Sequence, residues 1–150
     1  MGQQQLLLVI LVTIIVGVAT VVALNVFGNS AKNSNIDAVR QDMLQVATSA
    51  QGWYIKPSMM GGGNNSFTGM KFTDITFPAK ALSSDSLKAR NLNGTYIISN
   101  ETSAGFTIQA YPSQQVGYDT TLSSAPTSAY MEANVTTSDV KWVSGHKNPS

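Results

Sequence analysis

An uncharged apolar run in the first part of the sequence constrains this chain more than any other feature. It extends from Leu6 to Phe27, LLLVILVTIIVGVATVVALNVF, and its polar members are Thr13, Thr20 and Asn25. About 20 consecutive apolar residues are enough for a helix that crosses the hydrocarbon core of a membrane. At about 1.5 Å per residue the run spans roughly 33 Å as a helix. The sequence therefore predicts a membrane-spanning helix.

A cleaved secretory signal is a poorer interpretation of this run. Signal peptides carry a basic segment before an apolar stretch of about 7–15 residues, whereas no Lys or Arg precedes Lys32 and this run is longer. Two interpretations remain. The run is either a permanent single-pass anchor, or a helix that waits in the membrane before it packs into a filament.

A second, amphipathic helix is predicted after the run. Residues 28–35, GNSAKNSN, are weak helix formers, so we expect a soft joint there that is either weakened or locally unwound. Beyond it, apolar residues recur every three or four positions, which indicates one apolar helix face, while Asp42 and other polar residues fall largely on the other faces. Asn35 is the expected N-cap, and Pro57 follows Lys56 as a stop signal. The face expected to cover a sheet consists of Ile36, Val39, Met43, Val46, Ala47, Ala50 and Tyr54.

The rest of the chain predicts a small head rich in β-strands. The expected elements are a loop at 57–69, a strand or extended arm at 70–77, a short helix or turn-rich link at 79–93, a hairpin of 96–99 and 106–111, a long loop at 113–128, a strand pair at 129–136 and 140–144, and a polar tail. A sheet of about three to five strands needs cover on one face. The predicted fold is therefore α+β, with the long helix packed on a small antiparallel sheet.

Composition and motifs give no signature of an enzyme. The chain has no cysteine, which excludes disulfides and thiolate metal sites, and its net charge of +1 disfavours nucleic acid as a partner. The glycine run at 61–63 lacks the lysine of a phosphate-binding loop. His146 has no nucleophile motif beside it, and Asp119 lacks the companion ligands of a calcium loop. We expect no catalytic residues, metal or cofactor.

Two further features bear on the side of the membrane where the head lies. The positive-inside rule would weakly place Lys32 and Arg40 in the cytoplasm, but two basic residues carry little weight. Asn-x-Ser/Thr sequons are compatible with an outside location, although chance matches are common in a chain rich in these residues. The candidate glycosylation sites are Asn64, Asn93, Asn100 and Asn134.

In its order of elements the chain resembles type IV pilins and pseudopilins. The resemblance rests on a leader-type Gly2, an apolar helix half, an amphipathic half at 35–56, and a loop and sheet after it. The opening GQQQLLL also looks like that of bacterial pilin-like proteins with very short leaders. The resemblance implies four segments: a leader at 1–2 removed by a prepilin peptidase between Gly2 and Gln3, a core helix at 3–27, an amphipathic half at 28–56, and a head at 57–150. It also implies methylation of the new terminal amine.

One departure from the family lies at the start of the helix. The family usually places a glutamate at the fifth mature position, where it meets a neighbour's terminal amine. That position is Leu7 if cleavage follows Gly2, and Gln5 if the chain is uncleaved. The side-chain oxygens of Gln3, Gln4 and Gln5 can accept hydrogen bonds from an amine without forming a salt bridge.

The resemblance implies a structural subunit rather than an enzyme. Copies would wait in the inner membrane as single-pass proteins and then assemble, through pilus machinery, into an extracellular filament for adhesion or surface motility. A pseudopilin of a type II secretion system or a minor pilin is one alternative, and a monomeric membrane-anchored binding module is another. The residues expected in the filament core are Leu6, Leu7, Leu8, Ile10, Leu11, Ile14, Ile15, Gly17, Val18, Val21, Val22, Leu24 and Phe27.

Overall fold

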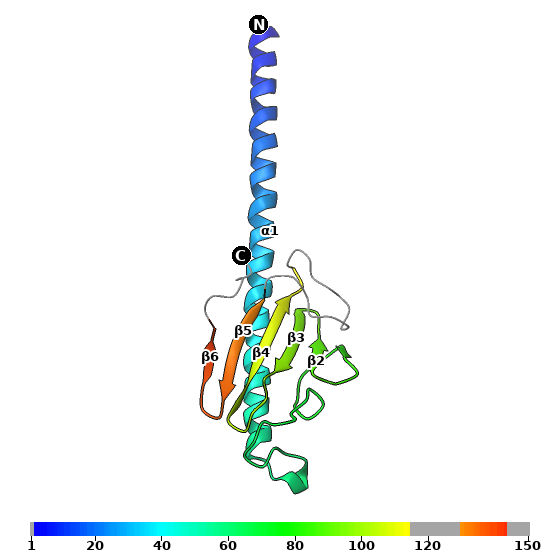
Figure 1. Cartoon of the computed structure of the whole chain (residues 1–150). Helices are drawn as coiled ribbons and strands as arrows, with labels where there is room; N and C mark the ends of the chain where they lie inside the picture. The colour runs from blue at the N-terminus through cyan, green and yellow to red at the C-terminus, as the bar shows by residue number, and fades with distance from the viewer. Residues whose placement is uncertain (1, 115–129, 144–150) are drawn as a thin grey trace.

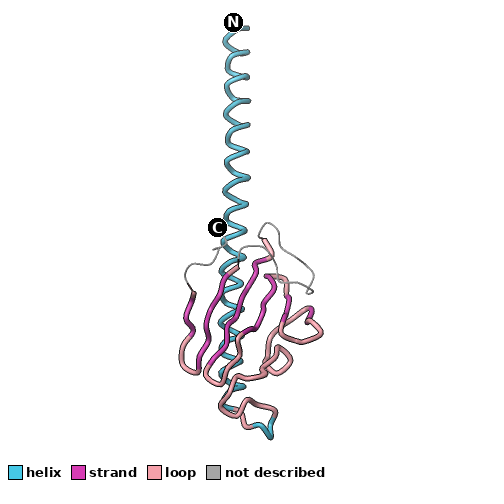
Figure 2. Tube along the Cα trace, viewed as in Figure 1, coloured by secondary structure: helices cyan, strands magenta, loops and turns pink. Residues whose placement is uncertain are grey.

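The computed structural model describes residues 2–114 and 130–143, and it has an α+β fold built on one long helix (Figure 1). Helix α1 (Gly2–Ile55) is continuous over 54 residues, which makes it roughly 80 Å long at about 1.5 Å per residue. Its second half lies along the sheet, and its first half projects beyond the head with no other element beside it (Figure 2). The α+β fold expected from the sequence is confirmed.

Local unwinding at 28–35, one of the two forms expected for the joint, is wrong, because the structure keeps this segment helical throughout. Propensity predicted a weak point, since each Gly, Asn or Ser costs up to about 1 kcal/mol relative to Ala. Unwinding, however, would create two new helix ends, each with unpaired backbone groups, and would require a second costly nucleation. Asn35 is consequently an interior helix residue and not an N-cap. Its Nδ2 donates instead to the carbonyl oxygen of Asn93, at 2.9 Å.

The described residues form one six-stranded antiparallel sheet whose spatial order follows the chain. The strands are β1 (Ala81–Leu82), β2 (Lys88–Arg90), β3 (Gly94–Ser99), β4 (Gly105–Pro112), β5 (Met131–Thr136) and β6 (Val140–Trp142). Strands β3 and β4 pair from Gly94 opposite Pro112 to Ser99 opposite Thr107, which confirms the predicted central hairpin. The last predicted strand pair is also present, as β5 and β6.

Two predictions for the head need correction. Residues 70–77 form turns and not a strand, although Met70, Phe72 and Ile75 are buried. Within 79–93 the chain forms the β1–β2 hairpin, so neither the short helix nor a plain link is correct. The Asp85 carboxylate accepts hydrogen bonds from the Ser83 hydroxyl and from the backbone N of Leu87, and such side-chain bonds favour a tight turn over a helix. Most of the predicted loop at 113–128 and the polar tail lie outside the described residues.

The core lies between the sheet and the second half of α1. The predicted helix face is buried at Ile36, Val39, Met43, Val46, Ala47 and Ala50. Tyr54 is partly buried, and its ring stacks on Phe67 with 4.7 Å between centroids, while Phe67 also contacts Phe106 at 5.4 Å. Alternate residues of the central strands point at the helix, as expected for a sheet with one covered face. They are Tyr96, Ile98, Phe106, Ile108, Ala110, Met131, Ala133 and Val135.

Candidate functional site: the exposed half of the helix

The first half of α1 is the strongest candidate for a functional surface. Every residue from 2 to 31 is exposed in the single chain, and we call this part of the helix the stem. The large apolar side chains predicted for the filament core, from Leu6 to Phe27, are 48 to 74% exposed. An apolar surface of this extent requires lipid or protein around it.

The stem is apolar on all sides and not along one stripe, because consecutive apolar residues point in every direction around a helix. Helices of this kind are buried in a membrane or inside a larger assembly. An 18-residue window of α1 reaches a mean hydropathy of 3.1, which by length and composition is enough to cross a membrane. Among the described residues there is therefore one helix, near the amino-terminal end, that could anchor the chain in a membrane.

The polar side chains of the stem differ in how they are satisfied. Thr13 Oγ1 donates to the carbonyl oxygen of Val9 at 2.7 Å, and Thr20 Oγ1 to that of Val16 at 2.8 Å. Such bonds to the preceding turn satisfy a hydroxyl proton within its own helix. The Asn25 amide, by contrast, has no hydrogen-bond partner among residues 2–114 and 130–143.

The start of the stem carries the residues expected at the leader junction. Gly2 and Gln3 lie in the first turn of α1, and Gln4 and Gln5 follow them. No acidic residue lies in this turn, so its backbone N–H groups face only neutral side chains of the chain itself.

A polar contact ties the head to the helix beside the core, and sequence reasoning missed it. Asp42 Oδ2 accepts hydrogen bonds from Asn91 Nδ2 at 2.8 Å, Asn93 Nδ2 at 2.8 Å and Tyr96 Oη at 2.6 Å. We call these four residues the Asp42 cluster. Hydrogen bonds to an ionised group are roughly twice as strong as neutral ones. The cluster therefore fixes the β2–β3 turn against α1 directionally, which apolar packing alone does not do.

The turn itself is built to present these donors. Asn91 Oδ1 accepts from the backbone N of Asn93 at 2.9 Å and from that of Gly94 at 3.1 Å, an arrangement typical of an Asx turn. This leaves the Nδ2 atoms of Asn91 and Asn93 for Asp42. The sequence signal was the position of Asp42 next to Met43, at the border of the apolar face, together with an asparagine-rich turn.

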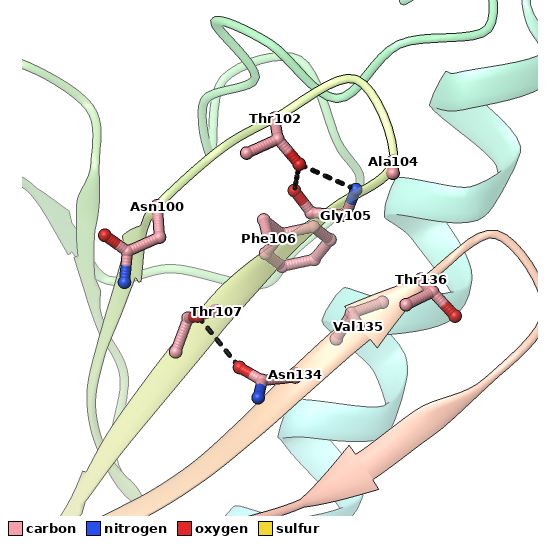
Figure 3. Close-up of a pocket in the computed structure, with 9 residues that line it drawn as sticks. All are labelled: Asn100, Thr102, Ala104, Gly105, Phe106, Thr107, Asn134, Val135 and Thr136. Carbon is pink, nitrogen blue, oxygen red and sulfur yellow. Dashed lines mark hydrogen bonds between the residues drawn. The ribbon is translucent and has the colours of Figure 1, made fainter.

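The four sequon asparagines have different surroundings. Nδ2 of Asn93, the atom that a glycan would be joined to, is held by Asp42. Asn64 is exposed in the loop after the helix, with φ of 50°. Asn100 and Asn134 line one shallow pocket of about 250 Å³ between the end of β3 and strand β5, shown in Figure 3. Asn134 Oδ1 accepts there from Thr107 Oγ1 at 2.9 Å. The structure therefore disfavours Asn93 as a glycosylation site.

The sheet face opposite α1 carries a strip of polar side chains, and among them the pKa of Tyr111 is shifted. Gln109 Nε2 donates to Glu132 Oε2 at 2.9 Å, and the rings of Tyr111 and Tyr130 lie 5.1 Å apart. Burial raises the pKa of Tyr111 above its ordinary value, with smaller contributions from Tyr130 and Glu132. Within the described part of the chain no three His, Asp or Glu side chains gather as metal ligands would. Asp119 and His146 lie outside that part.

Comparisons of the chain with protein families, with curated proteins and with solved structures give no match.

Proposed function

We propose that this protein is the structural subunit of an extracellular filament of the type IV pilus kind, assembled by packing the stems of many copies. The observation that supports this most directly is that one unbroken helix is both the exposed stem and the central element of the head's core. A simple membrane anchor needs only to cross the membrane, and a flexible linker between the anchor and the head would be sufficient. A lattice subunit needs its head in one fixed orientation relative to its packing surface, which a continuous helix provides.

Assembly exchanges one apolar environment for another. Copies are held in the inner membrane by their stems, and in the filament each stem is surrounded by other stems. Because lipid tails are as apolar as leucine, the gain comes from close packing, to which small residues such as Gly17 and Ala19 contribute by letting helices approach. A contact between two different faces of the same subunit repeats without closing, and this generates a helical polymer. The heads then form the outer surface, where they would serve adhesion or motility.

The test is a charge placed in the middle of the stem. Val16 and Val18 are exposed and lie on nearly opposite sides of the helix, at about 100° per residue. In the variant Val16→Arg, Val18→Arg we expect filaments to disappear from electron micrographs of cells. The control Val16→Leu, Val18→Leu keeps the stem apolar and should still give filaments.

An arginine at a helix centre costs roughly 2.5–3.5 kcal/mol on membrane insertion, so the arginine variant could also fail to insert. Membrane fractionation tells a failure of insertion from a failure of assembly. Arginine-variant filaments at the wild-type yield would contradict the proposal. A wild-type chain that stays monomeric in detergent and never forms fibres would favour the anchored binding module. Failure of protein secretion without long fibres would favour a pseudopilin.

A further inference from the structure

We propose that neighbouring stems are held in register by hydrogen bonds between the side-chain amides of Asn25 in one copy and Gln5 in the next, with a shift of about 30 Å along the helix axis. This inference rests on the proposed function, because it requires stems that pack side by side. It concerns which residues meet, and therefore the relative position of two copies.

The amide of Asn25 needs hydrogen-bond partners that its own chain does not supply within the described residues. An asparagine amide has two N–H donors and an acceptor oxygen, and within the described residues those of Asn25 have no partner. The other polar residues of the apolar run, Thr13 and Thr20, have already donated their protons to their own helix. An amide left unpaired in an apolar environment costs about 1–3 kcal/mol. Packed stems must therefore supply Asn25 with a partner from another copy.

The side chain that matches this need best is a glutamine. The same amide group stands at Gln3, Gln4 and Gln5, and no hydrogen bond within the described residues engages these three side chains. Asn29 carries it too, but lies only about 40° around the helix from Asn25, so it points to the same side and does not face Asn25 from a parallel neighbour. Two amides can donate to each other's oxygen at once, which satisfies one donor and one acceptor on each. A threonine hydroxyl whose proton is already committed can only accept.

Helix geometry selects Gln5 among the three glutamines. Successive residues turn by about 100°, so positions 5 and 25 point about 200° apart on one helix. Two parallel copies that differ by an axial shift, with little rotation about their own axes, face each other with opposite sides, which calls for about 180°. Gln5 misses this angle by about 20°, Gln4 by about 120° and Gln3 by about 140°. Two Asn25 side chains from different copies can meet only across an isologous interface. Such an interface closes into a dimer and does not extend into a filament.

The same spacing also suits the state before assembly. Twenty residues of helix span about 30 Å, which is the thickness of the hydrocarbon core. In a membrane both amides therefore reach the polar interfaces, and neither is buried without water. Once the stems leave lipid, a shift by that length brings the two amides together. A shift by one helical turn more or less, about 5.4 Å, would separate them, so the pair selects one register, as a buried polar pair does in coiled coils.

The chain lacks cysteine, so introduced cysteines report contacts without background. Filaments of the double variant Gln5→Cys, Asn25→Cys are oxidised and run on a non-reducing gel. We expect a ladder of dimers, trimers and longer species, because each copy would bond to one neighbour through position 5 and to another through position 25. Each single variant should stay monomeric. If the double variant does not assemble, filaments mixed from the two single variants should give dimers that neither single variant gives.

Other registers give distinguishable results. Dimers from Asn25→Cys alone would mean that two Asn25 side chains meet, and a ladder from Thr20→Cys, Asn25→Cys but not from the first pair would mean a shift of about 7.5 Å. Either result would overturn the inference, as would intact filaments of the double variant with no cross-link. None of these outcomes affects the proposed function, which fails instead if the wild-type chain forms no filaments.

Discussion

Replacing Asp42 by alanine tests whether a single carboxylate holds the head on the helix. The substitution removes one acceptor oxygen that three donors share, from Asn91, Asn93 and Tyr96. It leaves the apolar face of α1 unchanged, because Asp42 lies beside that face and not within it. The loss of stability therefore reports the polar contact and not the core.

The expected loss follows from the surroundings of the three donors. A hydrogen bond to a charged group contributes about 1.5–3 kcal/mol, and the three do not add fully because they share one oxygen. Asn91 and Asn93 are partly exposed and can bond to water after the substitution, whereas Tyr96 is fully buried. We therefore expect Asp42→Ala to lower the free energy of unfolding by about 2–4 kcal/mol. For a chain of this size, that lowers Tm by roughly 4–16 °C.

The measurement is thermal unfolding of the full chain in detergent, followed by tryptophan fluorescence. Trp53 lies near the end of α1, where it packs against the core, and Trp142 lies in β6, so neither reporter is in the stem. Asp37→Ala is the matched control: Asp37 is on the same helix and forms an ion pair with Arg40 at 3.3 Å, with more than half of both side chains exposed. A surface pair of this kind contributes about 0–1 kcal/mol. Equal Tm values for the two variants would refute the role assigned to the Asp42 cluster.

Two further predictions concern the sheet. A Cβ at Gly94 would lie 2.4 Å from the carbonyl oxygen of Tyr111, whereas one at Gly52 meets nothing within 4 Å. Gly94→Ala should therefore destabilise the head by about 1–3 kcal/mol, while Gly52→Ala should stabilise it by up to about 1 kcal/mol. Chemical denaturation measures both, and similar midpoints for the two variants would contradict this expectation. Burial raises the pKa of Tyr111, because the folded chain favours the neutral phenol. The contribution of Tyr111 to the free energy of unfolding is therefore present below about pH 10 and is lost as the pH rises further. Tyr111→Phe should reduce the loss of stability between about pH 9 and 11, and an unchanged loss would assign it to other groups.

Local patterns predicted the elements whose form depends on near neighbours. The apolar face from Ile36 to Ala50 follows from the helical repeat alone, and the β3–β4 hairpin from two β-prone runs around a turn. The continuity of α1 through 28–35 was missed, because propensity measures each residue by itself. The cost of two additional helix ends belongs to the helix as a whole.

The Asp42 cluster was missed for a different reason. Its members are 49, 51 and 54 positions from Asp42 along the chain, so no periodicity connects them. In the sequence, Asp42 looks like one more polar residue on a solvated helix face. Only the fold brings the asparagine-rich turn after β2 to the helix. Pairings of this kind depend on tertiary structure, and reading one chain by periodicity does not reveal them.

The contacts along the second half of α1 also decide how register in the stem affects the filament surface. Asn35 Nδ2 donates to the carbonyl oxygen of Asn93 at 2.9 Å, and Gln51 Nε2 to that of Thr136 at 3.0 Å, with the Asp42 cluster between them. Apolar packing is non-directional and would tolerate sliding or rotation of the head on the helix. Three directional contacts spread over about 24 Å of helix prevent both. The head therefore moves with the stem as one body, and a shift of one residue between stems, about 1.5 Å, displaces neighbouring heads by the same amount.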